Sequence, residues 1–184
     1  DRFSELVQQA DAPFLQAGGS VSGFLAGLDA FSLSVVPKPG QLENGFKKMM
    51  LEFERIQKFG FTQSELDRAV ISLNKSNETS FIERDKKKSD NYVNRYLSHF
   101  LKDDAALSND DDYKITKQLL PTLTLKEVNA LIAKYYTDLN RDIIIMGPEK
   151  DKVTLPNEAT VNTWLKSVEA ENITAYEDKV SKLP

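Results

Sequence analysis

The stretch that decides the fold is LEFERIQKFGFTQSELDRAV, residues 51–70. It joins two helical patterns through a single glycine, Gly60, which can adopt the left-handed backbone conformation that ends a helix. Thr62 then has the residue type of an N-cap, and Glu65 stands three positions later, as a capping box requires. Phe61, just before Thr62, and Leu66, just after Glu65, have the spacing of a hydrophobic staple. The sequence therefore predicts a rigid corner with a structural role, made by Gly60, Phe61, Thr62, Glu65 and Leu66.

Helical patterns extend to both sides of this corner. Upstream, apolar residues recur every three or four positions from Leu42 to Ile56, which predicts a helix with one core-facing stripe. Downstream, a helical pattern runs from Thr62 to about Leu101, and the charged run at 84–88 in its middle is typical of a solvated helix face. The late apolar residues that carry this helical pattern are Tyr92, Tyr96, Leu97 and Phe100.

Two strands are expected before the first of these helices. Residues 2–10 read as the end of a helix that Pro13 stops, and strands are predicted at about 15–25 and 28–36. Apolar and small polar residues alternate along the second strand, so one face is apolar and the other is small and polar. The apolar face has Phe31, Leu33 and Val35, and the polar face has Ser32 and Ser34.

The remaining chain predicts more helices and one further strand. A short helix ends at Pro121, and a second capping box, Thr124 with Glu127, starts the next helix. Residues 142–148 read as a buried strand that is apolar on both faces. A last helix follows Pro156, and its apolar residues lie along one stripe: Val161, Trp164, Leu165 and Val168. The residues of the helix after Thr124 that are expected to face inward are Val128, Leu131, Ile132 and Tyr135.

These elements predict an α+β fold with a small antiparallel or mixed sheet covered on one side by helices. We expect one domain over residues 1–171 and a linker over 172–184. Because the chain begins within a helical pattern and without methionine, we also expect it to be a piece of a larger protein, truncated at its N-terminus.

Composition excludes several classes of partner. The net charge is −4 and the pI about 5.2, with no basic stripe, so no nucleic-acid partner is expected. No apolar run approaches the ~20 residues that a membrane span needs. The chain has no cysteine, which excludes disulfides and thiolate metal sites.

The residues that carry chemistry are few. A zinc hydrolase site needs two or three imidazoles, and the single histidine is His99, near the end of a predicted helix. The acidic runs at 103–104 and 109–112 lack the glycine and final glutamate of a calcium loop and suit helix capping. No serine has an obvious general base. The sequence predicts no catalytic residue, no metal ligand and no cofactor of its own.

The segment at 51–70 resembles a motif of the pitrilysin/insulinase family of zinc metallopeptidases. The shared pattern is E-x-x-R-hydrophobic-x-x-x-G-hydrophobic-T-x-x-E-L-x-x-A. Further pieces resemble the family in the same order along the chain: RFSELVQQADAPFLQAG from Arg2, LPTLTLKEVNALIAKYY from Leu120, RDIIIMGPEK from Arg141 and LPNEATVNTWLKSVEAENITAYED from Leu155.

The resemblance implies a domain of a clamshell peptidase, related in fold to LuxS and the processing peptidases, which encloses unfolded peptides in a chamber. Zinc is expected in the parent protein, but the His-x-x-Glu-His zinc motif is missing here. The family's arginine and tyrosine of the second half correspond to Val7 and Phe14, which cannot stabilise an oxyanion. The chain therefore resembles a non-catalytic second domain of the first half, joined to other domains of the same polypeptide. The resemblance favours a bacterial periplasmic parent over a cytoplasmic one.

In this interpretation Ser32 and Ser34 face the chamber and contact extended peptide without strong sequence preference. Two other interpretations stay open at this point. In the first, the parent is a catalytically inactive family member that serves as a structural or binding subunit. In the second, the chain is an unrelated helical interaction module that uses Lys86, Lys87 and Lys88 and its acidic loops.

Overall fold

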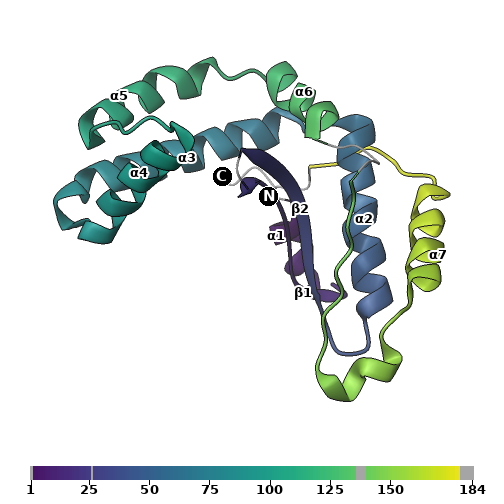
Figure 1. The fold of residues 1–184 in the computed structure, drawn as a ribbon. Coiled ribbons are helices and arrows are strands. Elements are labelled where there is room, and N and C mark those ends of the chain that lie inside the picture. Colours follow the sequence, from purple (N-terminus) through teal and green to yellow (C-terminus); the bar gives the residue numbers. More distant parts are fainter. Residues whose placement is uncertain (1, 26, 136–139, 179–184) are drawn as a thin grey trace. The chain divides into compact units, whose positions relative to one another are not determined.

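The computed structural model describes residues 2–25, 27–135 and 140–178 (Figure 1). Helices dominate, and the described residues contain one sheet, made of two strands joined as a hairpin. The strands are β1 (Phe14–Leu25) and β2 (Leu28–Pro37). The α-helices are α1 (Arg2–Val7), α2 (Leu42–Phe59), α3 (Gln63–Ile82), α4 (Ser89–Lys102), α5 (Asn109–Leu119), α6 (Leu125–Tyr135) and α7 (Glu158–Glu169). Short 3₁₀ helices are η1 (Arg84–Lys86), η2 (Leu120–Thr122) and η3 (Glu149–Thr154).

The chain forms two compact units. The first takes the described parts of 1–22, 31–60 and 129–184, and the second takes those of 23–30 and 61–128. The predicted corner therefore lies where the chain passes from one unit to the other. The expected single domain over 1–171 and linker over 172–184 stay predictions.

In the first unit, one face of the hairpin packs against α2. Phe31, Leu33 and Val35 are half-buried against the core, whereas Ser32 and Ser34 between them are exposed. The ring of Phe31 stacks on that of Phe53 in α2, with centroids 5.0 Å apart. The predicted alternation along β2 is confirmed, and with it an α+β fold whose small antiparallel sheet has helices on one side.

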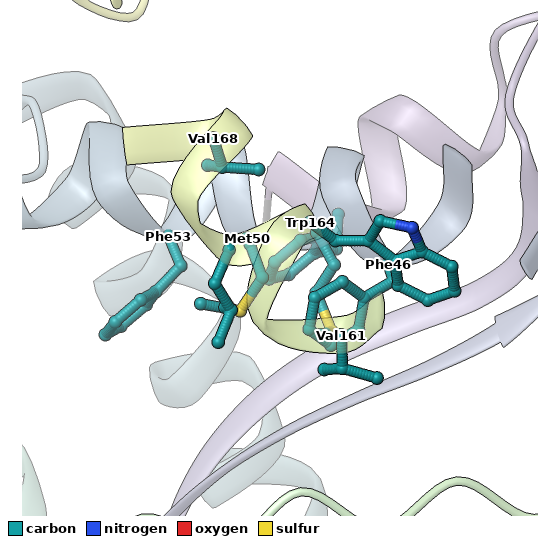
Figure 2. Close-up of a cluster of buried hydrophobic side chains, with 9 residues drawn as sticks. Phe46, Met50, Phe53, Val161, Trp164 and Val168 are labelled. Atoms are coloured by element: carbon teal, nitrogen blue, oxygen red, sulfur yellow. The ribbon is translucent and has the colours of Figure 1, made fainter. Parts of the chain in front are cut away.

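The core of the first unit lies between α2 and α7 (Figure 2). Apolar residues of both helices stand three or four positions apart, so each helix presents one continuous stripe to the other. The N-cap of α7 is Asn157, whose side chain accepts a hydrogen bond from the Thr160 backbone N–H at 3.0 Å. The predicted stripes are confirmed; their buried members are Phe46, Met49, Met50, Phe53, Val161, Trp164, Leu165 and Val168.

The corner at the end of α2 has the predicted hydrogen bonds. The Gly60 N–H donates to the Ile56 carbonyl at 2.7 Å. The Thr62 hydroxyl accepts from the Glu65 N–H at 3.3 Å, and the Glu65 carboxylate accepts from the Thr62 N–H at 2.8 Å, which completes the capping box. Leu66 is buried and Phe61 half-buried; the staple contact between them stays a prediction.

One detail of the corner differs from the prediction. Gly60 has the expected positive φ of 73°, but its ψ is −171°, so it is not in the left-handed helical region. This extended conformation with positive φ is essentially confined to glycine, because a Cβ atom clashes there with the backbone. The requirement for glycine is therefore stricter than an ordinary helix end would impose.

Replacing Gly60 by alanine is expected to lower the free energy of unfolding by about 1–3 kcal/mol, the cost of a strained backbone conformation. The new Cβ would also lie 2.8 Å from the Asn129 side chain. Urea denaturation followed by the fluorescence of Trp164 measures the change. Gly18→Ala is the matched control, because no atom lies within 4 Å of its Cβ position and its φ is not positive. Equal stability of the two variants would contradict this account of the corner.

In the second unit, α3 packs against α5. The rings of Phe81 and Tyr113 stack with centroids 4.3 Å apart, and Lys117 forms an ion pair with Glu78 at 3.0 Å. Hydrogen bonds from the hydroxyl and the N–H of Thr124 lower the pKa of Glu127, as its role in the second capping box requires. That predicted box is therefore also confirmed.

The predicted continuous helix from Thr62 to Leu101 is wrong. It breaks at residues 83–88, where η1 separates α3 from α4. Arg84 donates to the Phe81 carbonyl at 2.9 Å and so satisfies one of the last carbonyl groups of α3. The run at 84–88 contains no apolar residue that could hold a further helical turn against a core. These charged residues lie in a connection between helices and not on a helix face.

The four apolar residues of the late pattern lie in α4 as a helical pattern predicts, but only one of them is covered. Tyr92 is half-buried, but Tyr96, Leu97 and Phe100 are 62%, 50% and 84% exposed. In α6, the prediction that Leu131 faces inward is wrong, because this side chain is 51% exposed. Spacing identifies the apolar side of a helix, but burial also needs a neighbour that covers it.

The predicted buried strand at 142–148 does not form in this structure. The segment pairs with no strand among the described residues, and Ile144 and Met146 are 80% and 88% exposed. Ile145 alone packs partly against the core. At the N-terminus, α1 ends at Val7 and not at residue 10, because the chain tightens into turns, with Gln9 N–H donating to the Leu6 carbonyl.

Candidate functional site

The polar face of the hairpin is the predicted peptide-facing surface. Ser32 and Ser34 lie two positions apart on β2, so both side chains point to the side opposite Phe31 and Leu33, and both are exposed. Each hydroxyl can donate and accept a hydrogen bond. The structure thus leaves both serines accessible to an extended ligand, while their contact with peptide stays a prediction.

Val7 and Phe14 are the positions that the resemblance aligns with an arginine and a tyrosine of the family, and this correspondence stays a prediction. Val7 is the last residue of α1 and is half-buried. Phe14 is the first residue of β1 and has no exposed surface. Their aliphatic and phenyl groups offer no hydrogen-bond donor. Phe14 is fully buried, so its side chain serves packing in this structure.

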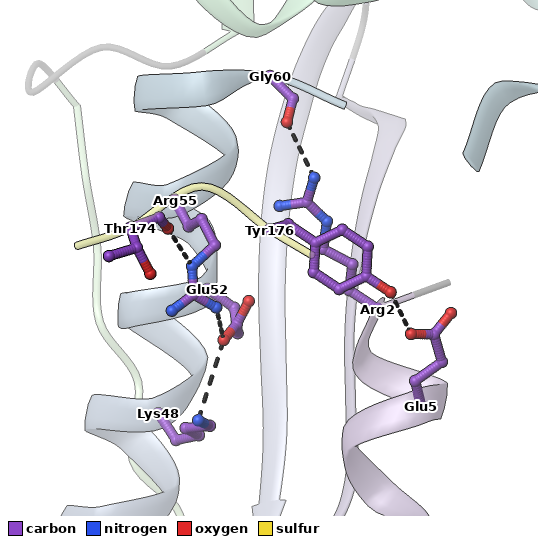
Figure 3. A network of polar contacts seen from close by, with 8 residues as sticks. All are labelled: Arg2, Glu5, Lys48, Glu52, Arg55, Gly60, Thr174 and Tyr176. Atoms are coloured by element: carbon purple, nitrogen blue, oxygen red, sulfur yellow. Dashed lines mark hydrogen bonds and ion pairs between the residues drawn. The ribbon is translucent and has the colours of Figure 1, made fainter. Parts of the chain in front are cut away.

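A buried carboxylate, which the sequence patterns did not indicate, lies on α2. Glu52 has only 1% of its surface exposed. The guanidinium group of Arg55, one turn later, forms an ion pair and hydrogen bond with it, and the ammonium group of Lys48 lies 4.0 Å from the same oxygen (Figure 3). A buried carboxylate is costly without such partners. These three residues form one charged cluster on α2.

The cluster holds the C-terminal segment of the chain. Arg55 Nε donates to the Thr174 carbonyl at 2.9 Å, across 119 positions of sequence (Figure 3). The neighbouring Ile173 is buried. The Tyr176 hydroxyl donates to the Glu5 carboxylate on α1. The segment after α7, which includes the start of the predicted linker, is therefore fixed to both α1 and α2.

Arg2 connects this region to the corner. It is 4% exposed, its guanidinium group lies 4.4 Å from the centre of the Tyr176 ring, and its Nη2 donates to the Gly60 carbonyl at 2.9 Å. Around these residues lies a hollow of about 520 Å³. Glu5 and Glu52 both accept hydrogen bonds from other residues of this network, so the network has a structural role. We call the residues labelled in Figure 3 the clamp.

A sequence signal for the clamp existed. Glu52 and Arg55 are the E-x-x-R of the family motif, and side chains three positions apart share one face of a helix. The motif served only to identify the family, although its spacing also allows an ion pair. Nothing in the sequence indicated Thr174 as the partner, because that contact joins segments far apart in the chain.

The described residues do not supply a zinc site. No group of three or more histidine, aspartate or glutamate residues lies close enough together in residues 2–25, 27–135 and 140–178 to hold a metal ion. His99 is exposed, and its Nδ1 lies 2.7 Å from the Asp104 carbonyl oxygen, just beyond the end of α4. Its surroundings suit a contact at the end of a helix.

The described part of the chain also contains no helix that is both long and apolar enough to cross a bilayer.

Comparison with known proteins points to one kind of protease. No protein-family model matches the chain. A curated protein of Arabidopsis thaliana, "Zinc protease PQQL-like", is 25% identical over 125 residues, which cover 68% of this chain and 13% of that protein. The chain thus spans only a small part of this relative's length.

Two solved structures share the fold. The first half of the periplasmic protease PqqL from Escherichia coli matches with a TM-score of 0.78 and 14% identity, over 96% of this chain and 38% of that one. The structure of PqqL itself matches with a TM-score of 0.80 and 14% identity, over 100% of this chain and 20% of that one. By sequence the chain is homologous to part of a PqqL-like zinc protease, and by fold it is similar to parts of PqqL.

Proposed function

We propose that the chain is a non-catalytic domain of a zinc-dependent clamshell endopeptidase and forms part of the wall of its peptide-enclosing chamber. The observation that carries the proposal is the match over 96% of the chain to the first half of PqqL. The absence of the His-x-x-Glu-His motif from the chain's sequence supports a domain other than the zinc-binding one. The likeness to PqqL, a periplasmic protease, favours a periplasmic parent.

The arrangement of the hairpin supports the proposal that this chain lines the chamber. Its apolar face packs on α2, while its other face presents Ser32 and Ser34. A rigid sheet face with small hydroxyl side chains can accept many extended peptides, because hydroxyl groups bind main-chain groups without selecting a side chain.

Exposed apolar residues support contacts with other domains of the same polypeptide. In the second unit, Leu97 and Phe100 on α4 are at least half exposed, and in the first unit so are Ile144 and Met146. Exposed large apolar side chains that lie together are typical of surfaces that a partner covers. The matched relatives are much longer than this chain, so further domains are the natural partners.

The proposal predicts that other parts of the parent protein bind zinc and cleave peptides, and that this chain alone does neither. After dialysis against zinc, the 184-residue chain is expected to keep no stoichiometric metal and to cleave no unfolded peptide. In the full-length parent, Ser34→Trp is expected to lower kcat/KM for an unfolded fluorogenic peptide and to leave the zinc content unchanged, because the indole narrows the chamber without touching the metal.

Asn162→Trp is the matched control, since Asn162 is exposed on α7 and not on the hairpin. Tightly bound zinc in the 184-residue chain, or cleavage by it that a chelator stops, would refute the proposal. A full-length parent that neither binds zinc nor cleaves peptide would instead identify an inactive structural or binding subunit.

A further inference from the structure

The second unit contains a hollow of about 710 Å³ where α3, the connection at 83–88 and the start of α4 meet. Positive and hydroxyl-bearing side chains dominate its lining. The four lysines are Lys75, Lys86, Lys87 and Lys88, and the hydroxyl groups come from α3, among them those of Ser76 and Thr79. We call this surface the lysine hollow.

The charge of the lysine hollow is opposite to that of the chain. Its lining has four ammonium groups and one carboxylate, that of Glu83, although the whole chain has a net charge of −4. Among the described residues, no carboxylate lies within ion-pair distance of Lys75, Lys86 or Lys88. Lys87 donates to the neutral side chain of Asn109 at 3.0 Å. The hollow therefore concentrates positive charge that the protein itself does not neutralise.

The connection that positions these lysines is anchored by polar contacts. Arg84 donates to the Phe81 carbonyl at 2.9 Å, and its own carbonyl accepts from the Tyr92 hydroxyl at 3.4 Å. Asn109 donates to that hydroxyl at 3.2 Å while it accepts from Lys87. This network holds the break between α3 and α4 in one conformation, so the lysines are presented together.

The hydroxyl groups define the shape of the ligand. The serines and threonine of α3 in the lining stand at 72, 76, 79 and 80, which places them along one side of the helix. From 72 to 80 this stripe is roughly 12 Å long, at 1.5 Å per residue. An extended peptide covers that length with roughly four residues. The hydroxyl groups can form hydrogen bonds with the main chain of an extended peptide. The ammonium groups beside them can form ion pairs with carboxylates that this peptide carries.

We propose that the lysine hollow binds acidic stretches of unfolded polypeptide. This inference rests on the proposed function, because it names the class of peptide segment that the domain prefers. Lysine ammonium groups on flexible stems act as point charges and do not demand one ligand geometry. The hollow would therefore select for negative charge along a segment and not for a particular sequence.

The test uses fluorescence anisotropy with the 184-residue chain and two labelled decapeptides, one rich in aspartate and glutamate and one made of serine and glycine. The acidic peptide is expected to bind about tenfold more tightly at low salt, with a preference that falls as salt screens the charges. The variant Lys75→Gln/Lys86→Gln/Lys88→Gln is expected to lose that preference; it keeps Lys87, which contacts Asn109.

The matched control is Lys114→Gln/Lys126→Gln/Lys166→Gln, which removes the same charge from exposed lysines outside the hollow and should retain the preference within about twofold. Far-UV circular dichroism verifies that both variants fold. Equal binding of the two peptides, unchanged by the hollow variant, overturns the inference and leaves the proposed function standing. Binding of neither peptide overturns both. Much stronger displacement by phosphate than by chloride at equal ionic strength would assign the hollow to phosphate and overturn the acidic-peptide assignment.

Discussion

Trp164→Ala is expected to lower the free energy of unfolding by about 3–5 kcal/mol, the usual cost of truncating a large buried aromatic residue. Trp164 is 8% exposed, and its ring lies 5.7 Å from that of Phe46, centroid to centroid, between α2 and α7. The substitution leaves a cavity where the two helices meet. Since the chain has one tryptophan, its fluorescence is lost, and far-UV circular dichroism in urea measures the change.

Two controls accompany this variant. Val153→Ala removes apolar atoms from a residue that is 92% exposed, and it should change stability by less than about 0.5 kcal/mol. Trp164→Phe keeps a ring in the core and should recover part of the loss. A Trp164→Ala variant within about 1 kcal/mol of the unmodified chain would show that the packing of α2 against α7 is not the main core.

Arg55→Met is expected to lower the free energy of unfolding by about 3–5 kcal/mol, because it leaves the buried carboxylate of Glu52 without its closest cation. Lys48 compensates little, since its ammonium group is 4.0 Å away and its side chain is 37% exposed. The variant also loses the hydrogen bond to the Thr174 carbonyl. Urea denaturation gives the loss of stability, and amide hydrogen exchange is expected to become faster across 172–178.

The same helix offers the control. Lys47 forms an ion pair with Glu43 at 2.6 Å, but both side chains are open to solvent, at 30% and 51% exposure. Lys47→Met should therefore lower the free energy of unfolding by less than about 1 kcal/mol. The double variant Glu52→Leu/Arg55→Met removes both buried charges and should regain most of the stability that Arg55→Met loses. If Arg55→Met costs no more than Lys47→Met, the clamp does not stabilise the first unit.

The candidate site could be predicted only in part. The alternation in β2 correctly assigned Ser32 and Ser34 to the exposed face, because side chains of a strand alternate whatever surrounds them. The role of Glu52 was missed, since its partner Arg55 also binds Thr174, in a segment far away in the sequence. The lysines at 86–88 were identified as a charged run but assigned to a helix face, and the helix break that gathers them was not foreseen.

By itself the sequence determined the local elements of this protein: both capping boxes, the hairpin and the apolar stripes of α2 and α7. These follow from patterns a few residues long, whose spacing matches the period of a helix or a strand. Only the tertiary structure decided that α3 and α4 are separate helices, that 142–148 lies unpaired, and that Arg55 holds Thr174. Each of these depends on which distant segment is available to cover an apolar side chain or to accept a hydrogen bond, and no local pattern encodes that neighbour.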